Sequence, residues 1–405
     1  MANTLPVIDD ITLAALDVFE NTLVAAKSCS RTLEKGFGVK GAQRGDSVRI
    51  RKPAQFTVRS GTAWSGQNIE EQYTTLTLNY QKGIDFSMTS KERKLDLNSL
   101  TDQVLKPAIV RLANEVDKDI LEVGTQACFN AVGTPGATPS TMQTYIDGGV
   151  LLTNFTCPRG DGERMLMINP EMEGDIAYAV REYFNPTRKI SGIFDSAELG
   201  IYAAGMNWNM DQNVYTHTVG TYAGTPRIKG ASQSGSSLLT DGWSADATNL
   251  TVGDRFTIAN VFAVNPVTKA TLSNLQQFVV TIACDDTAGD MTIAISPSIV
   301  GPGSPFQNVS ALPADDALIT VSGTTGLVYS QGVVWNKEAV ALAIVPLEKP
   351  EGVNQASMKY DDQSNVGLRY IEWYDGDTDL WKSRFDVVYG IQPQRMEWAC
   401  AIAAA

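Results

Sequence analysis

The longest helical pattern in the chain begins after Leu105, and the other predicted elements are arranged around it. Apolar residues recur there at steps of three and four, which places them on one side of an α-helix. They are Leu105, Ile109, Leu112, Val116, Ile120, Val123, Ala127 and Ala131. The charged residues Arg111, Asp117, Lys118, Asp119 and Glu122 fall on other faces. Pro107 suits a first turn because it has no N–H to donate. We therefore predict a helix from Lys106 to Ala131, roughly 39 Å long at about 1.5 Å per residue.

A second amphipathic helix is predicted for residues 8–28, with Asp9 or Asp10 as its N-cap. Ile11, Ala15, Leu16, Phe19, Leu23 and Ala26 lie on one side of it. The glycines Gly36, Gly38 and Gly41 follow, which favours an arm that swings over the alternative of a helix docked on its own domain. The string also matches GxGxxG, but a helix precedes it and a strand follows. Because a dinucleotide site needs the opposite order, we interpret the glycines as a hinge.

Two runs rich in β-branched and aromatic residues, 47–59 and 72–88, predict a β-ribbon. The polar tip between them carries Trp64. Since a two-stranded ribbon alone is marginally stable in water, we expect a neighbouring subunit to hold it, with Trp64 as an interface anchor. The alternative is that Trp64 folds back on its own subunit.

Residues 145–224 mix short strands and helices. Met165–Ile168 predicts a buried strand, and a helix follows from Pro170. His217 is the chain's single histidine, and it lies in the strand-like string YTHTV. With no candidate partner nearby in the sequence, we interpret it as a structural or exposed side chain rather than a catalytic one.

The composition changes at about Gly224. The stretch 225–332 contains no Glu and has four basic residues against eight aspartates. Short strands recur at Arg255–Ile258, Val261–Val264, Phe278–Ala283, Met291–Ile295, Leu318–Val321 and Leu327–Tyr329. This spacing predicts a small antiparallel barrel or sandwich inserted into a host domain. The acidic balance argues against a barrel for single-stranded nucleic acid, which needs a basic groove.

The last part of the chain predicts strands at Ala339–Val345, Val366–Tyr374, Leu380–Tyr389 and Arg395–Ile402. Asp375 and Gly376 form a typical hairpin turn pair between the second and third. Asp375, Asp377, Asp379 and Asp386 also occupy calcium-loop positions one, three, five and twelve. Position six is Leu380 where that loop needs glycine, and no helices flank it, so we expect a solvated turn and no bound metal.

Composition narrows the function. The 405 residues carry a formal charge of -13, which argues against a generally basic nucleic-acid binder. The five cysteines form no CxxC pair, a pattern typical of reduced thiols. We see no secretory signal, no membrane helix, and no GxSxG, HExxH or Walker motif. We therefore expect a soluble intracellular assembly protein that is not an enzyme and uses no cofactor.

The order of several strings resembles a known family. KPAIVRLANEVDKDI is followed by INPEM, VGDRFTIANVFAVNPVTKATLSNLQQFVV, WNKEAVALA, NVGLRYIEWYD, SRFDVVYGI and MEWACAI. In this order they resemble the major capsid proteins of tailed bacteriophages, in particular the short-tailed Salmonella-phage type. That type has the α+β Hong Kong 97-type fold, with a long spine helix, an extended β-ribbon loop and an inserted antiparallel β-barrel.

The resemblance implies a division of the chain into five parts. They are an N-terminal arm, 1–35; an extended loop, 48–86; a peripheral domain with the spine helix, 87–134 and 340–405; an axial domain, 135–224 and 332–339; and the inserted barrel, 225–331.

The resemblance also implies partners. Many copies, as hexamers and pentamers, would close an icosahedral shell in the host cytoplasm, first as a scaffolded procapsid that expands around double-stranded DNA. A scaffolding protein and a portal protein would take part, and no membrane. The acidic arm residues Asp9, Asp10, Asp17 and Glu20 are candidate scaffold contacts.

The loop-like string DGWSAD carries Asp241 and Asp246, which are candidates for a contact between subunits across a two-fold axis or, alternatively, solvated turn carboxylates. The extended loop has no lysine between Pro53 and Gln81, so we predict no covalent cross-linking of subunits. The alternatives are an encapsulin-like compartment shell and, more distantly, a metal-dependent hydrolase.

Overall fold

The computed structural model consists of two units. The first contains Met1–Ile50, Tyr73–Ile120 and Ala341–Gln392, and the second contains Arg51–Gln72, Leu121–Val340 and Pro393–Ala405. The structure describes residues 8–31, 47–52, 56, 61–62, 64, 66, 72–90, 105–159, 163–180, 205–245, 248–345, 347–350, 355–361 and 366–405. The predicted glycine hinge lies outside these ranges. No helix within them is long and apolar enough to cross a membrane.

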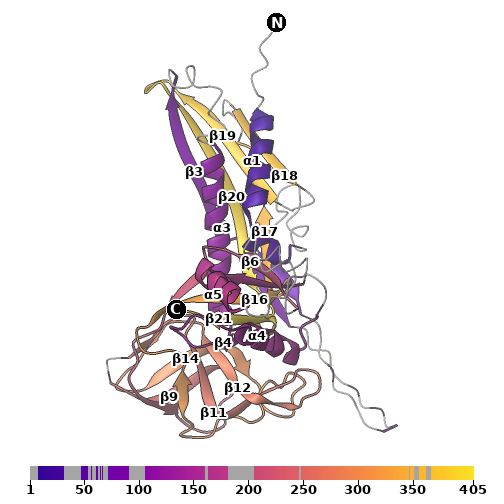
Figure 1. Ribbon diagram of the computed structural model, residues 1–405, viewed down its shortest axis with the longest axis vertical. Coiled ribbons are helices and arrows are strands. Elements are labelled where there is room, and N and C mark those ends of the chain that lie inside the picture. Colours follow the sequence, from indigo (N-terminus) through magenta and orange to yellow (C-terminus); the bar gives the residue numbers. More distant parts are fainter. Residues whose placement is uncertain are drawn as a thin grey trace. The chain divides into compact units, whose positions relative to one another are not determined.

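The first unit is built on an antiparallel sheet. Its strands are β3 (Tyr80–Thr89), β17 (Val340–Val345), β18 (Gln355–Asp361), β19 (Val366–Asp375) and β20 (Leu380–Pro393). The order is β17-β20-β19-β18, and β3 pairs with the first part of β20, from Thr89 opposite Leu380 to Tyr80 opposite Tyr389. Figure 1 shows β3, β20, β19 and β18 side by side. β20 is therefore the central strand of this unit.

The two segments predicted to form a β-ribbon, 47–59 and 72–88, do not pair along their whole length. The second run splits into β2 (Tyr73–Thr77) and β3, and only β2 pairs with β1 (Ser47–Arg51). Leu76 is fully buried with Ala343, and Val48 and Ile50 pack against the pair. Periodicity could not show the break after Thr77, because the alternation continues across it while the hydrogen-bonding partner changes.

Helix α1 (Ile8–Thr22) is docked on its own unit, so the docked alternative is the observed arrangement. Ala15, Leu16, Phe19 and Leu23 are buried, and the helix packs on β18 and β19. Asp9 and Asp10 lie in its first turn rather than at an N-cap. The chain continues into a short 3-10 helix, η1 (Ala25–Ser28). The expected apolar face is correct, and it covers the sheet.

The spine helix α3 (Lys106–Ala127) begins where predicted but ends four residues early. Ala131 belongs to β4 (Ala131–Val132), which pairs with a strand of the second unit. We also expected Asp117 and Asp119 on polar faces, yet both are buried, at 2% and 8% exposure. Each carboxylate has a hydrogen-bond donor from another element, which the periodicity of one helix cannot reveal.

The second unit contains a mixed six-stranded host sheet. Its strands are β4, β5 (Arg164–Ile168), β6 (Asn207–Met210), β7 (Tyr215–Thr218), β16 (Val328–Asn336) and β21 (Ala399–Ala403). The order is β4-β21-β16-β5-β6, and β7 pairs with the first half of β16. Helices α4 (Met142–Asn154) and α5 (Pro170–Val180) contribute Tyr145, Leu152, Met172 and Ile176 to its core. The predicted strand at Arg395 begins only at Ala399, because the 3-10 helix η5 (Met396–Trp398) precedes it.

The inserted domain of the same unit is an antiparallel barrel. Its sheet order is β15-β11-β12-β14-β9-β8. The strands are β8 (Gly224–Ile228), β9 (Gly235–Trp243), β11 (Arg255–Val264), β12 (Thr271–Val280), β14 (Met291–Ile299) and β15 (Ile319–Val321), and β10 (Asn249–Leu250) pairs separately with β13 (Cys284–Asp285). Arg227 of β8 forms a bridge with Leu318 next to β15, which closes the sheet. Phe256, Ile258, Phe278 and Ile293 lie in its core.

One predicted barrel strand belongs to the host instead. Leu327–Tyr329 leads into β16, whose residues Val328–Gln331 pair with β7 and whose residues Val333–Asn336 pair with β5. Composition changes gradually there, but hydrogen bonding assigns the whole strand to the host sheet.

Candidate functional site

The clearest cluster of buried polar groups lies where the barrel joins the host sheet, within the second unit. Arg255, the first residue of β11, is 4% exposed. Its Nη2 donates to the carbonyl of Thr125 at 2.8 Å and its Nε to that of Cys128 at 2.7 Å. Its Nη1 donates to Oε1 of Gln331 on β16 at 2.8 Å. The last carbonyls of a helix have no partner within it and attract a cation, so Arg255 of the barrel caps the end of α3.

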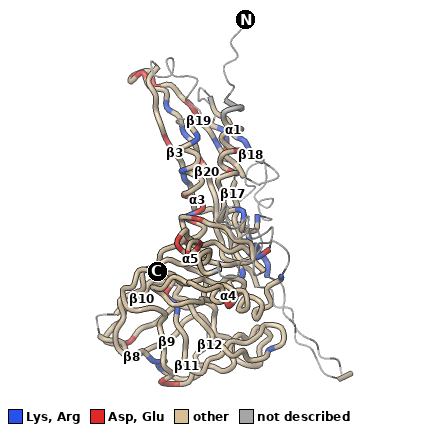
Figure 2. The backbone as a smooth tube through the Cα atoms, viewed as in Figure 1, with Lys and Arg blue, Asp and Glu red and all other residues tan. Residues whose placement is uncertain are grey.

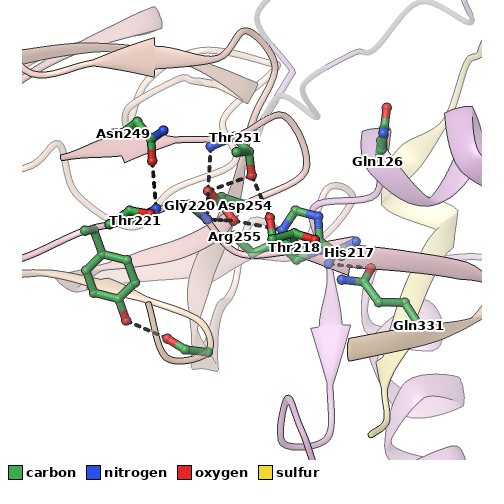
Figure 3. A network of polar contacts seen from close by, with 12 residues as sticks. Gln126, His217, Thr218, Gly220, Thr221, Asn249, Thr251, Asp254, Arg255 and Gln331 are labelled. Carbon is green, nitrogen blue, oxygen red and sulfur yellow. Dashed lines mark hydrogen bonds and ion pairs between the residues drawn. The ribbon is translucent and has the colours of Figure 1, made fainter. Parts of the chain in front are cut away.

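Asp254 directs its carboxylate to a different set of partners (Figure 3). Oδ2 accepts from the backbone N–H of Thr251 at 2.7 Å and of Gly220 at 3.1 Å. Oδ1 lies 2.8 Å from Nε2 of His217. A Cβ on Gly220 would lie 2.4 Å from the carbonyl of Asn249 and 2.9 Å from Oδ2 of Asp254. Only glycine therefore fits where this loop passes the carboxylate.

His217 thus has a partner that the sequence analysis did not find, because Asp254 lies 37 residues further along the chain. Nδ1 of His217 lies 3.4 Å from the hydroxyl of Tyr215, which accepts from Nε2 of Gln126 on α3 at 3.0 Å. With the His217 proton on Nε2, each group in this chain donates to the next. His217 and Asp254 are each 1% exposed, so the pair is enclosed and acts as a structural joint.

A third contact ties β12 of the barrel to the edge of the host sheet. Nε2 of Gln277 donates to the carbonyl of Ala131 at 3.0 Å, and its Oε1 accepts from the N–H of Ala131 at 2.6 Å. The side-chain amide thus pairs with edge strand β4 as a neighbouring peptide unit would. Together with Arg255 and Asp254, it attaches the barrel through groups that the host backbone leaves unpaired.

Trp64 is 88% exposed, and its ring lies over Gly66, where a Cβ would approach it to 2.6 Å. Phe56 and Tyr73 from the same part of the chain are 63% and 58% exposed. The guanidinium of Arg49 lies 4.9 Å from the centre of the Tyr73 ring. These aromatic side chains leave a large apolar area in water, as interface anchors do before assembly.

Asp241 lies in strand β9, half-buried, and not in the loop that we expected; Asp246 lies outside the described residues. Asp241 pairs across strands with Arg227 of β8. The hydrogen bond from Lys229 to Asp290, together with the charges of Asp290 and Asp241, raises the pKa of Lys229. The charge of Asp241 is therefore partly balanced by basic residues of its own barrel.

The four aspartates of the possible calcium loop are not brought together. Asp375 and Leu380 are paired, so the hairpin loop has four residues, and Asp379 has a positive φ of 52°. Hydrogen bonds from Lys382, Thr378 and the Asp377 N–H lower the pKa of Asp375 to about 2. Asp386 lies further along β20, opposite Arg369. The expected two-residue turn is therefore wrong, and the carboxylates of Asp375, Asp379 and Asp386 accept hydrogen bonds from protein donors. Among the described residues, no group of His, Cys, Asp and Glu is arranged to hold a metal ion.

Comparison with known proteins decides the family. The family model "P22 coat protein - gene protein 5" matches residues 2–400. The chain belongs to this coat protein family. No curated protein sequence matches it.

Several solved structures are similar to this chain at low identity. One from Mycobacterium phage Che8 has a TM-score of 0.45 at 14% identity, covering 94% of this chain and 90% of its own. The capsid of Ralstonia phage GP4 has 0.44 at 9%, covering 94% and 88%. A virus-like particle from Pyrococcus furiosus has 0.40 at 9%, covering 96% of each chain.

The family match confirms the resemblance drawn from the order of the sequence motifs. The chain is a major capsid protein of this coat protein type and forms the icosahedral head shell, and its α+β fold is consistent with the Hong Kong 97 type. The family is one of structural proteins of the virion.

Sequence reasoning missed the residues that hold the coat protein together internally. It does not single out Arg255 or Gln277, and it places Asp117 on a polar face. A charged residue at the start of an apolar strand, as in DRFTI, is a signal for Arg255. Its acceptors Cys128 and Thr125, at and just after the end of α3, are 127 and 130 residues away and cannot be read from the pattern.

Proposed function

We propose that this coat protein assembles as hexamers and pentamers into a scaffolded procapsid, which then expands around double-stranded DNA. In this proposal the shell encloses DNA without reading its sequence, and a portal protein occupies one vertex. Assembly takes place in the host cytoplasm. Membership of the coat protein family supports self-assembly, and the surface of the subunit suggests where copies meet.

The exposed aromatic side chains carry the proposal. Trp64 and Phe56 are too exposed to stabilise their own subunit much, since the hydrophobic contribution scales with the area removed from water. Aromatic residues dominate the binding energy of many interfaces. We infer that a neighbouring copy covers Trp64 and that its ring anchors the segment between β1 and β2. Half-buried Asp241 and exposed Arg227, which pair across β9 and β8, form a second proposed contact between copies, and Asp246 belongs to the same proposal.

The partner of the acidic arm in this proposal is the scaffolding protein. Leu13 is 50% exposed, and Asp17 is exposed one turn later on α1, with half-buried Glu20 following. Residues at this spacing share one face of a helix, so they present an apolar side chain beside two carboxylates. We call Leu13, Asp17 and Glu20 the exposed stripe of α1. A helix with basic residues around one apolar residue would complement it. Asp9 and Asp10 lie in the first turn of the same helix.

The decisive experiment compares Trp64→Ala with Trp64→Phe. We expect Trp64→Ala to leave the unassembled subunit as stable as the original protein, because so little of the ring is buried. Shells of this variant should assemble more slowly and dissociate at a lower denaturant concentration. Trp64→Phe, which retains an aromatic ring, should show an intermediate effect. Sedimentation of assembled shells over a urea series measures this, and unchanged shells of Trp64→Ala would exclude the anchor.

A further inference from the structure

A buried carboxylate of the spine helix binds the segment that follows α1, from Val24 to Ser30, which we call the root of the N-terminal arm. Oδ2 of Asp117 accepts a hydrogen bond from the backbone N–H of Val24 at 2.6 Å, and Oδ1 accepts one from Ala26 at 2.9 Å. Val24 is the N-cap residue of η1 and Ala26 lies in its first turn. The partners are 93 and 91 residues apart in sequence, so this is a tertiary contact. Asp117 is 2% exposed, so water does not supply an alternative partner.

The residues around this contact are packed tightly. Ala25, Ala26 and Cys29 are 0% exposed. Ser30 forms a parallel bridge with Ala341, and its carbonyl accepts from the N–H of Leu342 at 3.0 Å. The root therefore contacts the spine helix at its beginning and β17 at its end. Asp117 binds it just after α1 ends.

Apolar packing and the Asp117 contact have different roles. The buried face of α1, with Ala15, Leu16 and Phe19, adheres to the sheet without a directional requirement. Hydrogen bonds to an ionised carboxylate are both directional and stronger than neutral ones. The carboxylate therefore fixes the path of the chain where it leaves α1, while the buried apolar face decides which side of α1 lies on the sheet.

We propose that Asp117 is a positioning residue for the arm. It pins the root to α3 and thereby holds the end of α1, and with it the exposed stripe of Leu13, Asp17 and Glu20, in place for a partner. The second half of this statement rests on the proposed function, in which the partner is the scaffolding protein. The first half concerns the subunit alone and is tested separately.

Trypsin provides the readout, because Lys27 is an exposed cleavage site within the pinned root. In Asp117→Asn the side chain keeps one oxygen, which can still accept a hydrogen bond from one backbone N–H. The amide NH2 replaces the other oxygen and cannot accept from the second N–H, so one hydrogen bond is lost. We expect cleavage of the unassembled protein after Lys27 to become about tenfold faster, since a lost hydrogen bond to a charged group has an effect of this order on local opening.

Asp119→Asn is the matched control. Asp119 lies two residues further on the same helix and is also buried, but it accepts from the hydroxyl of Tyr389 and pairs with Lys82. It should leave cleavage after Lys27 unchanged, whatever it does to global stability. Equal acceleration in both variants, or none in Asp117→Asn, would overturn the assignment of Asp117.

A double variant, Asp17→Asn with Glu20→Gln, separates this inference from the proposed function. It should keep the original trypsin rate and lose scaffold-dependent assembly together with its sensitivity to salt. If it assembles with scaffold like the original protein, scaffold binding by the stripe is wrong. The trypsin comparison still decides whether Asp117 pins the root.

Discussion

Arg255 satisfies three acceptors at the junction between barrel and host, and its removal should be costly. Arg255→Met keeps most of the apolar stem but leaves the carbonyls of Thr125 and Cys128 and the amide of Gln331 without this donor in a buried site. We expect a loss of about 3 kcal/mol in the free energy of unfolding, measured by urea denaturation. Arg255→Lys should recover only part of it, because an ammonium cannot reproduce the fork of a guanidinium. A loss below about 0.5 kcal/mol, the level of an ordinary surface change, would contradict the capping role.

At the residue scale, the burial of side chains is easier to predict from the sequence than their hydrogen-bond partners. The apolar positions Ile109, Leu112 and Val116 are buried as expected, because burial follows from periodicity within one helix. The partners of His217 and Asp117 lie 37 and more than 90 residues away. Such contacts depend on how the elements pack, and periodicity contains no information on that.

At the scale of elements, β3 and β20 are held by a charged ladder as well as by backbone hydrogen bonds. Arg384 binds both carboxylate oxygens of Asp85, at 2.6 and 2.9 Å, and Arg369 of β19 binds Asp386 at 2.7 Å. Figure 2 shows acidic and basic positions interspersed on these strands. Gly83 lies opposite Asp386, and a Cβ there would be 2.6 Å from Oδ1 of Asp386 and 2.7 Å from the carbonyl of Phe385.

Gly83→Ala should therefore destabilise the protein by about 1–3 kcal/mol, the usual cost of forcing an extra carbon into a packed site. The Phe385 carbonyl belongs to the strand backbone and cannot move away without disturbing the pairing with β3. Gly174→Ala is the control: Gly174 lies inside α5, and a Cβ added there would meet nothing within 4 Å, so alanine should stabilise by up to about 1 kcal/mol. Urea denaturation of both variants measures the difference. Equal effects of the two substitutions would show that the close approach at Gly83 is not needed.

Element boundaries were predictable where a local signal marks them and wrong where partners decide. Pro107 and Pro170 lie in the first turns of α3 and α5, as their missing N–H groups require. α3 ends before Ala131, which pairs with β21 instead, and Arg255 of the barrel binds the carbonyls of Thr125 and Cys128 at this end. The run 72–88 breaks because its two halves pair with different strands. The four-residue loop after Asp375 is stabilised by the aspartate side chain, which accepts from Asp377 and Thr378.

At the scale of the whole molecule, each unit is formed by segments that are far apart in the sequence. Three separate segments form the first unit, Met1–Ile50, Tyr73–Ile120 and Ala341–Gln392, and the barrel is inserted into the second. The change in composition at Gly224 coincides with the start of β8, because a strand-rich insert with short turns has a different residue usage from its host. The family then supplies what one copy cannot show, namely that many copies close into a shell.

The sequence of the extended loop also predicts whether the copies in the shell are joined by covalent bonds. A covalent link through the extended loop would need a nucleophilic amine, and between Pro53 and Gln81 the chain has no lysine. Arg59 lies in this stretch, but a guanidinium remains protonated and does not attack carbonyl groups. We therefore expect mature shells, boiled in detergent with reductant, to give a single band near 43.7 kDa on a denaturing gel. A parallel lane without reductant separates any disulfide formed by the five cysteines from other links. A ladder of multiples that persists with reductant would contradict the prediction, because the copies would then be joined by a covalent bond although there is no lysine between Pro53 and Gln81 to form it.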